Sequence, residues 1–123
     1  MKRALIVDDS RTMRMILKKY LLALGFEVQE AGNGLEGLAA LGEAGPVDVC
    51  LVDWNMPGMN GLEFVRSVRS QPEYAGIRIM MVTSETDMQR MLQALEAGAD
   101  EYVMKPFTKE VIEDKLSLLG FAA

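Results

Sequence analysis

Short apolar runs alternate along this chain with segments of helical spacing. The runs at residues 4–7, 49–52 and 77–82 predict buried strands, and shorter candidates lie at 26–29 and 101–104. Between them, apolar residues recur every three or four positions, the spacing of a helix with one buried face. Five strands alternating with five helices predict an α/β protein whose parallel sheet is covered on both faces.

Two of the predicted helices show both their apolar stripe and their end. The first stripe stops before Gly25 and the second before Gly98, and glycine suits the left-handed conformation that ends many helices. The stripes consist of Met13, Ile16, Leu17, Tyr20, Leu21 and Leu24, and of Met88, Met91, Leu92 and Leu95.

Capping residues mark the helix starts. Asn-Gly-Leu-Glu occurs at residues 33–36 and 60–63, and both copies predict an asparagine cap with a glutamate at the third helical position. Thr86 and Thr108 predict two further caps. Right-handed crossovers leave few topologies for such a chain. We expect the flavodoxin-like (βα)5 three-layer sandwich, with a parallel five-stranded sheet of order 2-1-3-4-5.

Composition describes an ordinary globular domain and excludes several kinds of chemistry. The 123 residues are half hydrophobic, and the net charge of −5 argues against a nucleic-acid-binding surface. No histidine is present, which excludes a Ser-His-Asp triad, an HExxH zinc site and a phosphohistidine relay within the chain. One cysteine excludes an internal disulfide and fits a reducing cytoplasm. No apolar stretch approaches the roughly 20 residues of a membrane span.

Polar residues follow the predicted strands at their carboxyl ends. Asp8 and Asp9 follow the first strand, Asp53 the third, Thr83 the fourth and Lys105 the fifth. Because parallel strands end on one side of a sheet, these groups are expected to share a cleft. Two like charges about 4 Å apart repel by roughly 4 kcal/mol at an effective dielectric near 20. The acidic group therefore holds either a proton or a cation.

The chemistry of these groups favours phosphoryl transfer. Hard oxygen ligands favour Mg²⁺, with Mn²⁺ as an alternative ion, and the predicted metal ligands are Asp8, Asp9 and Asp53. Lys105 offers a positive charge and Thr83 a hydroxyl donor to phosphoryl oxygens. Asp53 can attack phosphorus as a nucleophile and form an acyl phosphate. No organic cofactor is expected. The basic residues of the first helix predict a solvated face, with docking of a kinase or phosphatase as the alternative; they are Arg11, Arg14, Lys18 and Lys19.

The sequence resembles the receiver domains of two-component response regulators over essentially its whole length. The acidic pair, the lone aspartate at 53, the MPGMNG loop at 56–61, Thr-Ser at 83–84 and Lys-Pro-Phe at 105–107 match in order and spacing. The resemblance is greatest to the stand-alone, CheY-like chemotaxis type. It implies one receiver domain over residues 1–123, without an output domain. Such a domain is a signalling switch rather than an enzyme, although it takes part in its own Mg²⁺-dependent phosphorylation and autodephosphorylation.

The resemblance also implies roles for single residues. A histidine kinase would phosphorylate Asp53, and the backbone carbonyl of Asn55 would join the metal ligands. Asn55 and Glu85 would tune the attack of water on the phosphoryl group, and the Lys105–Pro106 bond would be cis. Binding would change on the face formed by the fourth helix, fifth strand and fifth helix. The switch and partner positions are Tyr102, Ser84, Glu85 and Met88.

Implied partners are the histidine kinase, a phosphatase and a downstream protein such as a flagellar motor switch protein. The expected form is a cytoplasmic monomer that binds neither nucleic acid nor membrane. Chemotaxis regulators often carry basic residues where the fourth helix begins, whereas this chain has Thr86-Asp87-Met88. A phosphate sink or an adaptor for a non-motor target therefore stays open as an alternative.

Two rival classes fit less well. A haloacid-dehalogenase-type phosphatase also uses an aspartate nucleophile, but needs Asp-x-Asp after the first strand and usually a cap domain. A flavodoxin-like electron carrier needs a Ser/Thr/Gly-rich phosphate loop there. Asp8-Asp9-Ser10-Arg11 provides neither and would repel a flavin phosphate.

Overall fold

A five-stranded parallel sheet forms the centre of the molecule in the computed structural model, which describes residues 2–43, 45–84 and 88–121. The strands follow the order β2-β1-β3-β4-β5, and each neighbouring pair is parallel. The predicted flavodoxin-like order is confirmed. The strands are β1 (Arg3–Val7), β2 (Glu27–Ala31), β3 (Val49–Val52), β4 (Arg78–Thr83) and β5 (Glu101–Met104).

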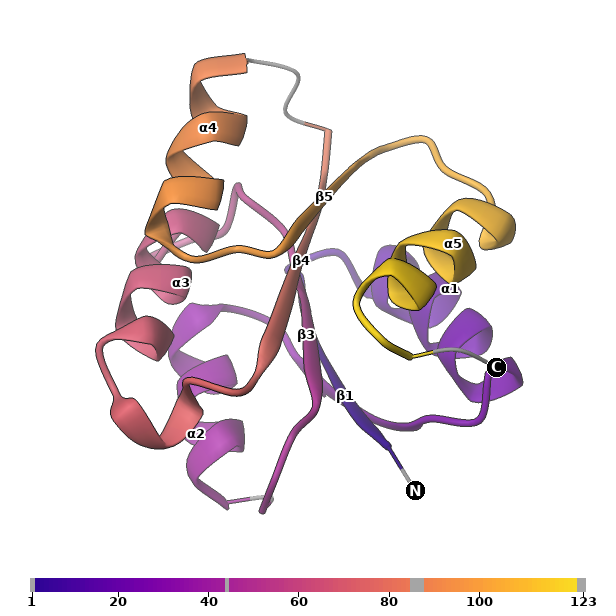
Figure 1. The fold of residues 1–123 in the computed structure, drawn as a ribbon, viewed down its shortest axis with the longest axis horizontal. Coiled ribbons are helices and arrows are strands. Elements are labelled where there is room, and N and C mark those ends of the chain that lie inside the picture. The colour runs from indigo at the N-terminus through magenta and orange to yellow at the C-terminus, as the bar shows by residue number, and fades with distance from the viewer. Residues whose placement is uncertain (1, 44, 85–87, 122–123) are drawn as a thin grey trace.

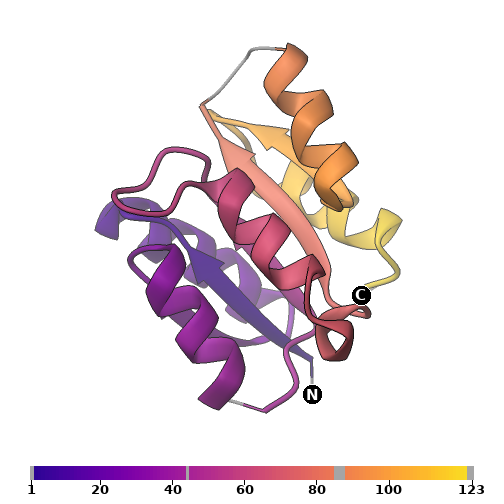
Figure 2. The ribbon, with the colours of Figure 1, turned by 90° about the vertical axis from the view of Figure 1, so that its left-hand side faces the viewer.

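Helices cover both faces of the sheet. Figure 1 shows α2, α3 and α4 on one side and α1 and α5 on the other, and Figure 2 views the first group from in front. None of the helices in the described part of the chain is long and apolar enough to traverse a bilayer. The helices are α1 (Arg11–Ala23), α2 (Gly34–Glu43), α3 (Gly61–Arg69), α4 (Met88–Ala97) and α5 (Lys109–Leu118), with a short 3-10 turn η1 (Pro72–Tyr74).

Side-chain caps begin α1, α3 and α5, and those at Asn60 and Thr108 were predicted. Asn60 begins α3 with a complete capping box, in which its side chain and that of Glu63 each accept the other's backbone N–H. Ser10 and Thr108 accept backbone N–H groups in the first turns of α1 and α5. The cap predicted at Thr86 lies outside the described residues.

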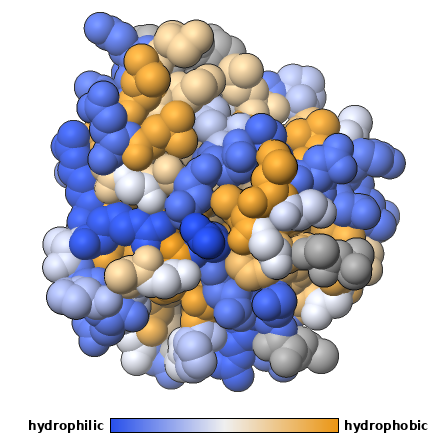
Figure 3. All heavy atoms as spheres, viewed as in Figure 1, coloured by the Kyte–Doolittle hydropathy of each residue, from blue (hydrophilic) through white to orange (hydrophobic). Residues whose placement is uncertain are grey.

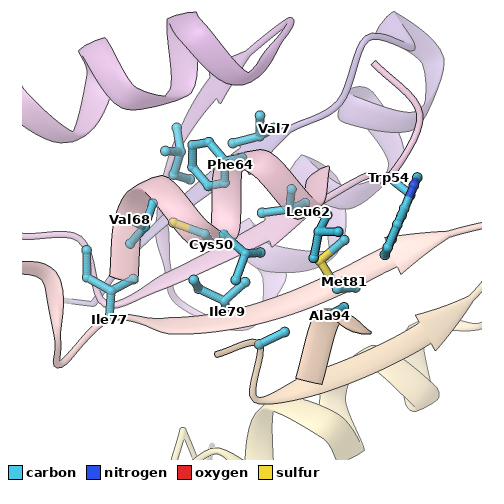
Figure 4. Packing of buried hydrophobic residues seen from close by; sticks show 14 of the residues in the cluster. Val7, Cys50, Trp54, Leu62, Phe64, Val68, Ile77, Ile79, Met81 and Ala94 are labelled. Atoms are coloured by element: carbon cyan, nitrogen blue, oxygen red, sulfur yellow. The ribbon is translucent and has the colours of Figure 1, made fainter. Parts of the chain in front are cut away.

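Alternating side chains divide the interior into two hydrophobic cores. Leu5 and Val7 of β1 pack under α2, α3 and α4, whereas Ala4 and Ile6 pack under α1 and α5. This period of two is that of a strand buried on both faces. Figure 4 shows the first core, which surrounds Cys50. Burial raises the pKa of the Cys50 thiol to about 12.

The apolar stripe of α4 is not a core face. Met88, Leu92 and Leu95 are 64%, 50% and 39% exposed, and within the described residues of this helix only Ala94 is buried. The prediction that the stripe packs inward is wrong for Leu92 and Leu95, whereas the exposure of Met88 agrees with its predicted place on a partner surface. The helix contacts the core through Ala94 and through Met91, which is the partly buried residue of the stripe. Figure 3 shows hydrophobic surface over α4, at the upper left, flanked by hydrophilic residues.

Candidate functional site

Four strand ends deliver polar side chains to one edge of the sheet. Asp8 follows β1, Asp53 follows β3, Thr83 ends β4 and Lys105 follows β5. Asp8, Asp53 and Thr83 are 1%, 8% and 0% exposed, which is unusual burial for two carboxylates. The predicted convergence of these groups is confirmed by the contacts of Lys105 with Asp8 and Asp53 and by the hydrogen bond from Thr83 to Asp53.

Three carboxylates meet closely enough to share a cation. One oxygen from each of Asp8, Asp9 and Asp53 lies within 4.8 Å of the other two, and only Asp9 among them is exposed to solvent. All three are hard oxygen donors, without a nearby imidazole or thiolate, which is the donor set that Mg²⁺ takes together with water. The residues therefore fit a divalent hard cation.

Lys105 lies between the two buried carboxylates. Its Nζ is 3.2 Å from Asp8 Oδ2 and 3.7 Å from Asp53 Oδ1, and its side chain is 18% exposed. The backbone N–H of Lys105 donates to the carbonyl of Thr83. The pairing of β4 with β5 therefore holds the backbone from which the Lys105 side chain extends. A single ammonium only partly balances three acidic groups, which leaves the cleft suited to further positive charge.

Asp53 is harder to ionise than an ordinary aspartate. Burial raises the pKa of its carboxyl, and this effect exceeds the lowering caused by Lys105; the charge of Asp8 raises the pKa further. Hydrogen bonds from the side chain of Thr83 and the backbone N–H of Trp54 act in the opposite direction. The Trp54 N–H donates to Asp53 Oδ1 at 2.8 Å. A divalent cation in the cleft would favour the ionised form.

The chain that carries Asp53 is held on both sides. The backbone N–H of Asp53 donates to Val7, and the carbonyl of Trp54 accepts from Gly61 at the start of α3. A side chain at Gly61 would clash with the carbonyl oxygen of Asp53 and approach the Cα of Trp54. Glycine at this position therefore lets α3 begin directly against the carboxylate-bearing loop.

The basic face predicted for α1 is wrong for one residue. Arg14 is 19% exposed at its side chain, donates from Nη1 to the backbone carbonyl of Asp8 and pairs with Glu30. This hydrogen bond holds the backbone that carries the acidic pair Asp8 and Asp9. Because Arg14 lies one turn into the helix that follows Asp8, the helical rise alone places it within reach. A hollow of about 820 Å³, lined mainly by α1, β2 and α2, opens beside Asp9.

The other predicted positions have different surroundings. Tyr102 is 9% exposed and packs in the first core, whereas Ser84, Asn55 and Met88 are exposed. Glu85 lies outside the described residues. The Lys105–Pro106 bond is cis, as expected.

One contact next to the site was not foreseen from the sequence. The guanidinium of Arg90 in α4 lies 5.6 Å from the centroid of the buried Trp54 ring. The two residues are far apart along the chain, and no local pattern connects them, so only the fold brings them together.

Fold and site together define a class: doubly wound α/β proteins with a carboxylate, hydroxyl and lysine cluster at the edge where strand order reverses. The family model for the response regulator receiver domain matches residues 4–117, and the chain belongs to that family. It is thus a response regulator of the two-component type.

Proteins similar to this chain carry chemotaxis names. It is 43% identical to the chemotaxis protein CheY1 of Helicobacter pylori over 118 residues, which is 95% of each chain. It is 45% identical to a chemotaxis protein CheY homolog of Campylobacter jejuni, over 93% of this chain and 88% of that relative. The solved structure of the chemotaxis response regulator CheY4 of Vibrio cholerae has a TM-score of 0.90 and 36% identity, covering 97% of this chain and 98% of that one.

Proposed function

We propose that the protein accepts a phosphoryl group on Asp53 from a histidine kinase and switches partner binding in cytoplasmic chemotaxis signalling. The observation that carries this proposal is the buried Asp53 carboxylate, set between an acidic pair and Lys105. The chemotaxis names of similar proteins support the pathway. The absence of histidine from this chain means that the phosphohistidine must come from a partner.

In the transfer step, an oxygen of the Asp53 carboxylate attacks phosphorus while the bond from phosphorus to the donor imidazole nitrogen breaks. The bonding electron pair leaves with that nitrogen, and an acyl phosphate forms. Lys105 and Thr83 would hold phosphoryl oxygens by charge and by hydrogen bond. Asp8, Asp9 and the backbone carbonyl of Asn55 would hold Mg²⁺, which neutralises charge on the phosphoryl oxygens.

Autodephosphorylation reverses the modification without the kinase. Water attacks phosphorus, the bond between phosphorus and the Asp53 oxygen breaks, and the carboxylate and inorganic phosphate are released. Asn55 is exposed on the loop after Asp53, and its side chain together with that of Glu85 would control the approach of this water. The protein is then ready for another signal rather than for turnover of a free substrate.

The proposed output face is formed by α4, β5 and α5. Thr83 would move towards the phosphoryl group, Tyr102 would change rotamer, and the partner surface around α4 would rearrange. Met88 and Leu92 offer exposed apolar contacts there. Because this chain has Thr86-Asp87-Met88 where chemotaxis regulators often carry basic residues, an adaptor or phosphate sink with a non-motor target is a second candidate role.

The first experiment tests the nucleophile. Asp53→Asn should abolish labelling of the protein by radiolabelled acetyl phosphate in Mg²⁺, because an amide cannot form the acyl phosphate. Asp114→Asn, an equal change at an exposed position of α5, should label like the wild type. Labelling of Asp53→Asn at the wild-type level would place the nucleophile elsewhere.

A second experiment tests the switch. Proteins captured from a lysate should differ with and without beryllofluoride, which mimics the phosphoryl group on Asp53. Leu92→Gln on the exposed stripe should lose the beryllofluoride-dependent capture while labelling normally, since Leu92 is 50% exposed and belongs to neither hydrophobic core. Equal capture of the same proteins under both conditions would refute phosphorylation-dependent binding.

A further inference from the structure

The helix α4 is attached to the molecule by a small buried surface. Within its described residues only Ala94 is buried, whereas five residues of α3 are. Elements with few buried contacts have the lowest local stability and move most readily. A single additional contact can therefore have a large influence on the position of α4.

Arg90 makes such a contact. Its guanidinium lies over the ring of Trp54, 5.6 Å from the ring centroid, which is within the range of a cation–π interaction. Trp54 is only 5% exposed and belongs to the same core as Met81 and Ala94. Figure 4 shows its ring at one end of this core. Arg90 is thus a half-buried cation that links α4 to a fixed aromatic ring.

Trp54 is in turn tied to the carboxylate of Asp53. Its backbone N–H donates to Asp53 Oδ1 at 2.8 Å, and its backbone carbonyl accepts from Gly61 at 2.8 Å. Two hydrogen bonds thus hold the peptide groups on both sides of its Cα. Any change in the acceptor strength of Asp53 Oδ1 alters one of the two.

We propose that Arg90 is a positioning residue that couples phosphorylation of Asp53 to α4 through the ring of Trp54. This inference rests on the proposed function and deepens it. Ionised Asp53 accepts the Trp54 N–H in a charge-assisted hydrogen bond, whereas an acyl phosphate leaves a neutral carbonyl, a weaker acceptor. Trp54 is then held less firmly, and its contact with Arg90 weakens. The contact favours the unphosphorylated arrangement, and coupling of this kind is reciprocal.

Trp54 provides the optical signal for the test because it is the only tryptophan of the chain. Wild type, Arg90→Met, Arg90→Lys and Gln93→Ala are titrated with beryllofluoride in excess Mg²⁺ while tryptophan emission is recorded. Gln93 is exposed on the same helix and serves as the matched control. Hydrogen exchange of the α4 amides is measured for each variant with and without beryllofluoride.

Arg90→Met should bind beryllofluoride about 2–5-fold more tightly than the wild type, a factor at the lower end of the range for cation–π contacts. Exchange of its α4 amides should be faster by a similar factor without beryllofluoride and should change less when it binds. Arg90→Lys keeps a cation and should fall between Arg90→Met and the wild type. Gln93→Ala should match the wild type.

Different failures identify different errors. Wild-type affinity and exchange in Arg90→Met would overturn the coupling while the proposed function stood. Weaker binding by Arg90→Met would assign the contact to the phosphorylated arrangement and overturn the proposal as stated, and an Arg90→Lys variant equal to Arg90→Met would remove the role of the cation. A wild-type protein whose emission and α4 exchange ignore beryllofluoride would refute the proposed function itself, together with this inference.

Discussion

Asp53 destabilises the fold at neutral pH because its charge is buried. Burial raises the pKa of this carboxyl above its ordinary value of 3.8 despite the opposing effect of Lys105. Between the ordinary and the raised pKa, the folded protein therefore binds more protons than the unfolded chain. The stabilising contribution of Asp53 is complete below about 3.8 and is lost as pH rises through the raised pKa.

Replacing Asp53 should therefore stabilise the protein without Mg²⁺. We expect Asp53→Asn to raise the free energy of unfolding at pH 7 by about 1 kcal/mol, a common size for single substitutions. The gain should shrink towards zero as pH falls and the wild-type carboxyl takes up its proton. Urea denaturation over a pH series measures both, with Asp114→Asn as the exposed control. Equal free energies of unfolding for wild type and Asp53→Asn at pH 7 would show that the buried charge of Asp53 does not destabilise the fold.

Gly61 should tolerate no side chain, since a Cβ there meets the backbone of the Asp53 loop. Gly61→Ala should lower the free energy of unfolding by about 1–3 kcal/mol, as overpacking does. A Cβ added at Gly42 in α2 would meet open space. Gly42→Ala should therefore be neutral or stabilise the protein by up to about 1 kcal/mol. Thermal unfolding of the two variants compares them directly, and equal effects would exclude the clash as the cause.

At the scale of elements, the sequence predicted strands better than helix faces. The run at 49–52 coincides with β3, because four consecutive apolar residues have no alternative inside a doubly covered sheet. Leu92 and Leu95 of the α4 stripe were misjudged because spacing shows that a helix has an apolar face but not what covers that face. Because the exposed residues of this stripe are not covered by the protein itself, they form the candidate partner surface.

The element ends opposite the site are held together by Arg69 at the end of α3. Its guanidinium pairs with Asp100 at 3.0 Å and donates to the backbone carbonyls of Gly98 and Tyr74, and its side chain is 19% exposed. This group joins α3, the turn η1 and the loop before β5. It fixes the distal end of α4 while the end near Trp54 carries the proposed coupling.

Removal of the Arg69 side chain should destabilise the fold. Arg69→Ala should lower the free energy of unfolding by about 2 kcal/mol, since several partly buried acceptors lose their donor. Arg78 also approaches Asp100, but at 3.7 Å and with a side chain that is 51% exposed. Arg78→Ala should change stability by less than about 0.5 kcal/mol. Chemical denaturation of both variants measures the two losses of stability. Equal losses would indicate a general effect of surface charge rather than the contacts of Arg69.

On the scale of the whole molecule, the acidic cleft is where sequence reasoning was most successful. Asp8, Asp53 and Lys105 stand at strand ends, and parallel topology alone brings such positions together. The contact between Arg90 and Trp54 depends on tertiary packing, which no local pattern encodes. Arg14 lies within local reach of Asp8, but its spacing does not show that its side chain turns back to the Asp8 carbonyl. The residues that form the site were therefore predictable from the sequence, whereas the contacts that support it or connect it to α4 were not.

Binding of Mg²⁺ should stabilise the entire fold, because the three carboxylates come together only in the native state. At a free concentration 100-fold above the dissociation constant, one site adds about 2.7 kcal/mol. Asp9→Asn should lose most of this increment and Glu73→Gln, an exposed change at the other end of the molecule, should keep it. Melting curves with Mg²⁺ and with a chelator measure the increment. Equal increments in the two variants would exclude the acidic cleft as the binding site.

The inert thiol in the first core makes the protein convenient for labelling studies. Cys50 is fully buried, and with its pKa raised to about 12 it is almost entirely protonated at neutral pH. Maleimide dyes should therefore ignore the native chain, and a cysteine placed at Gln93 would be the only reactive one. A fluorophore on α4 could report its displacement by energy transfer from Trp54, without first engineering a thiol-free background.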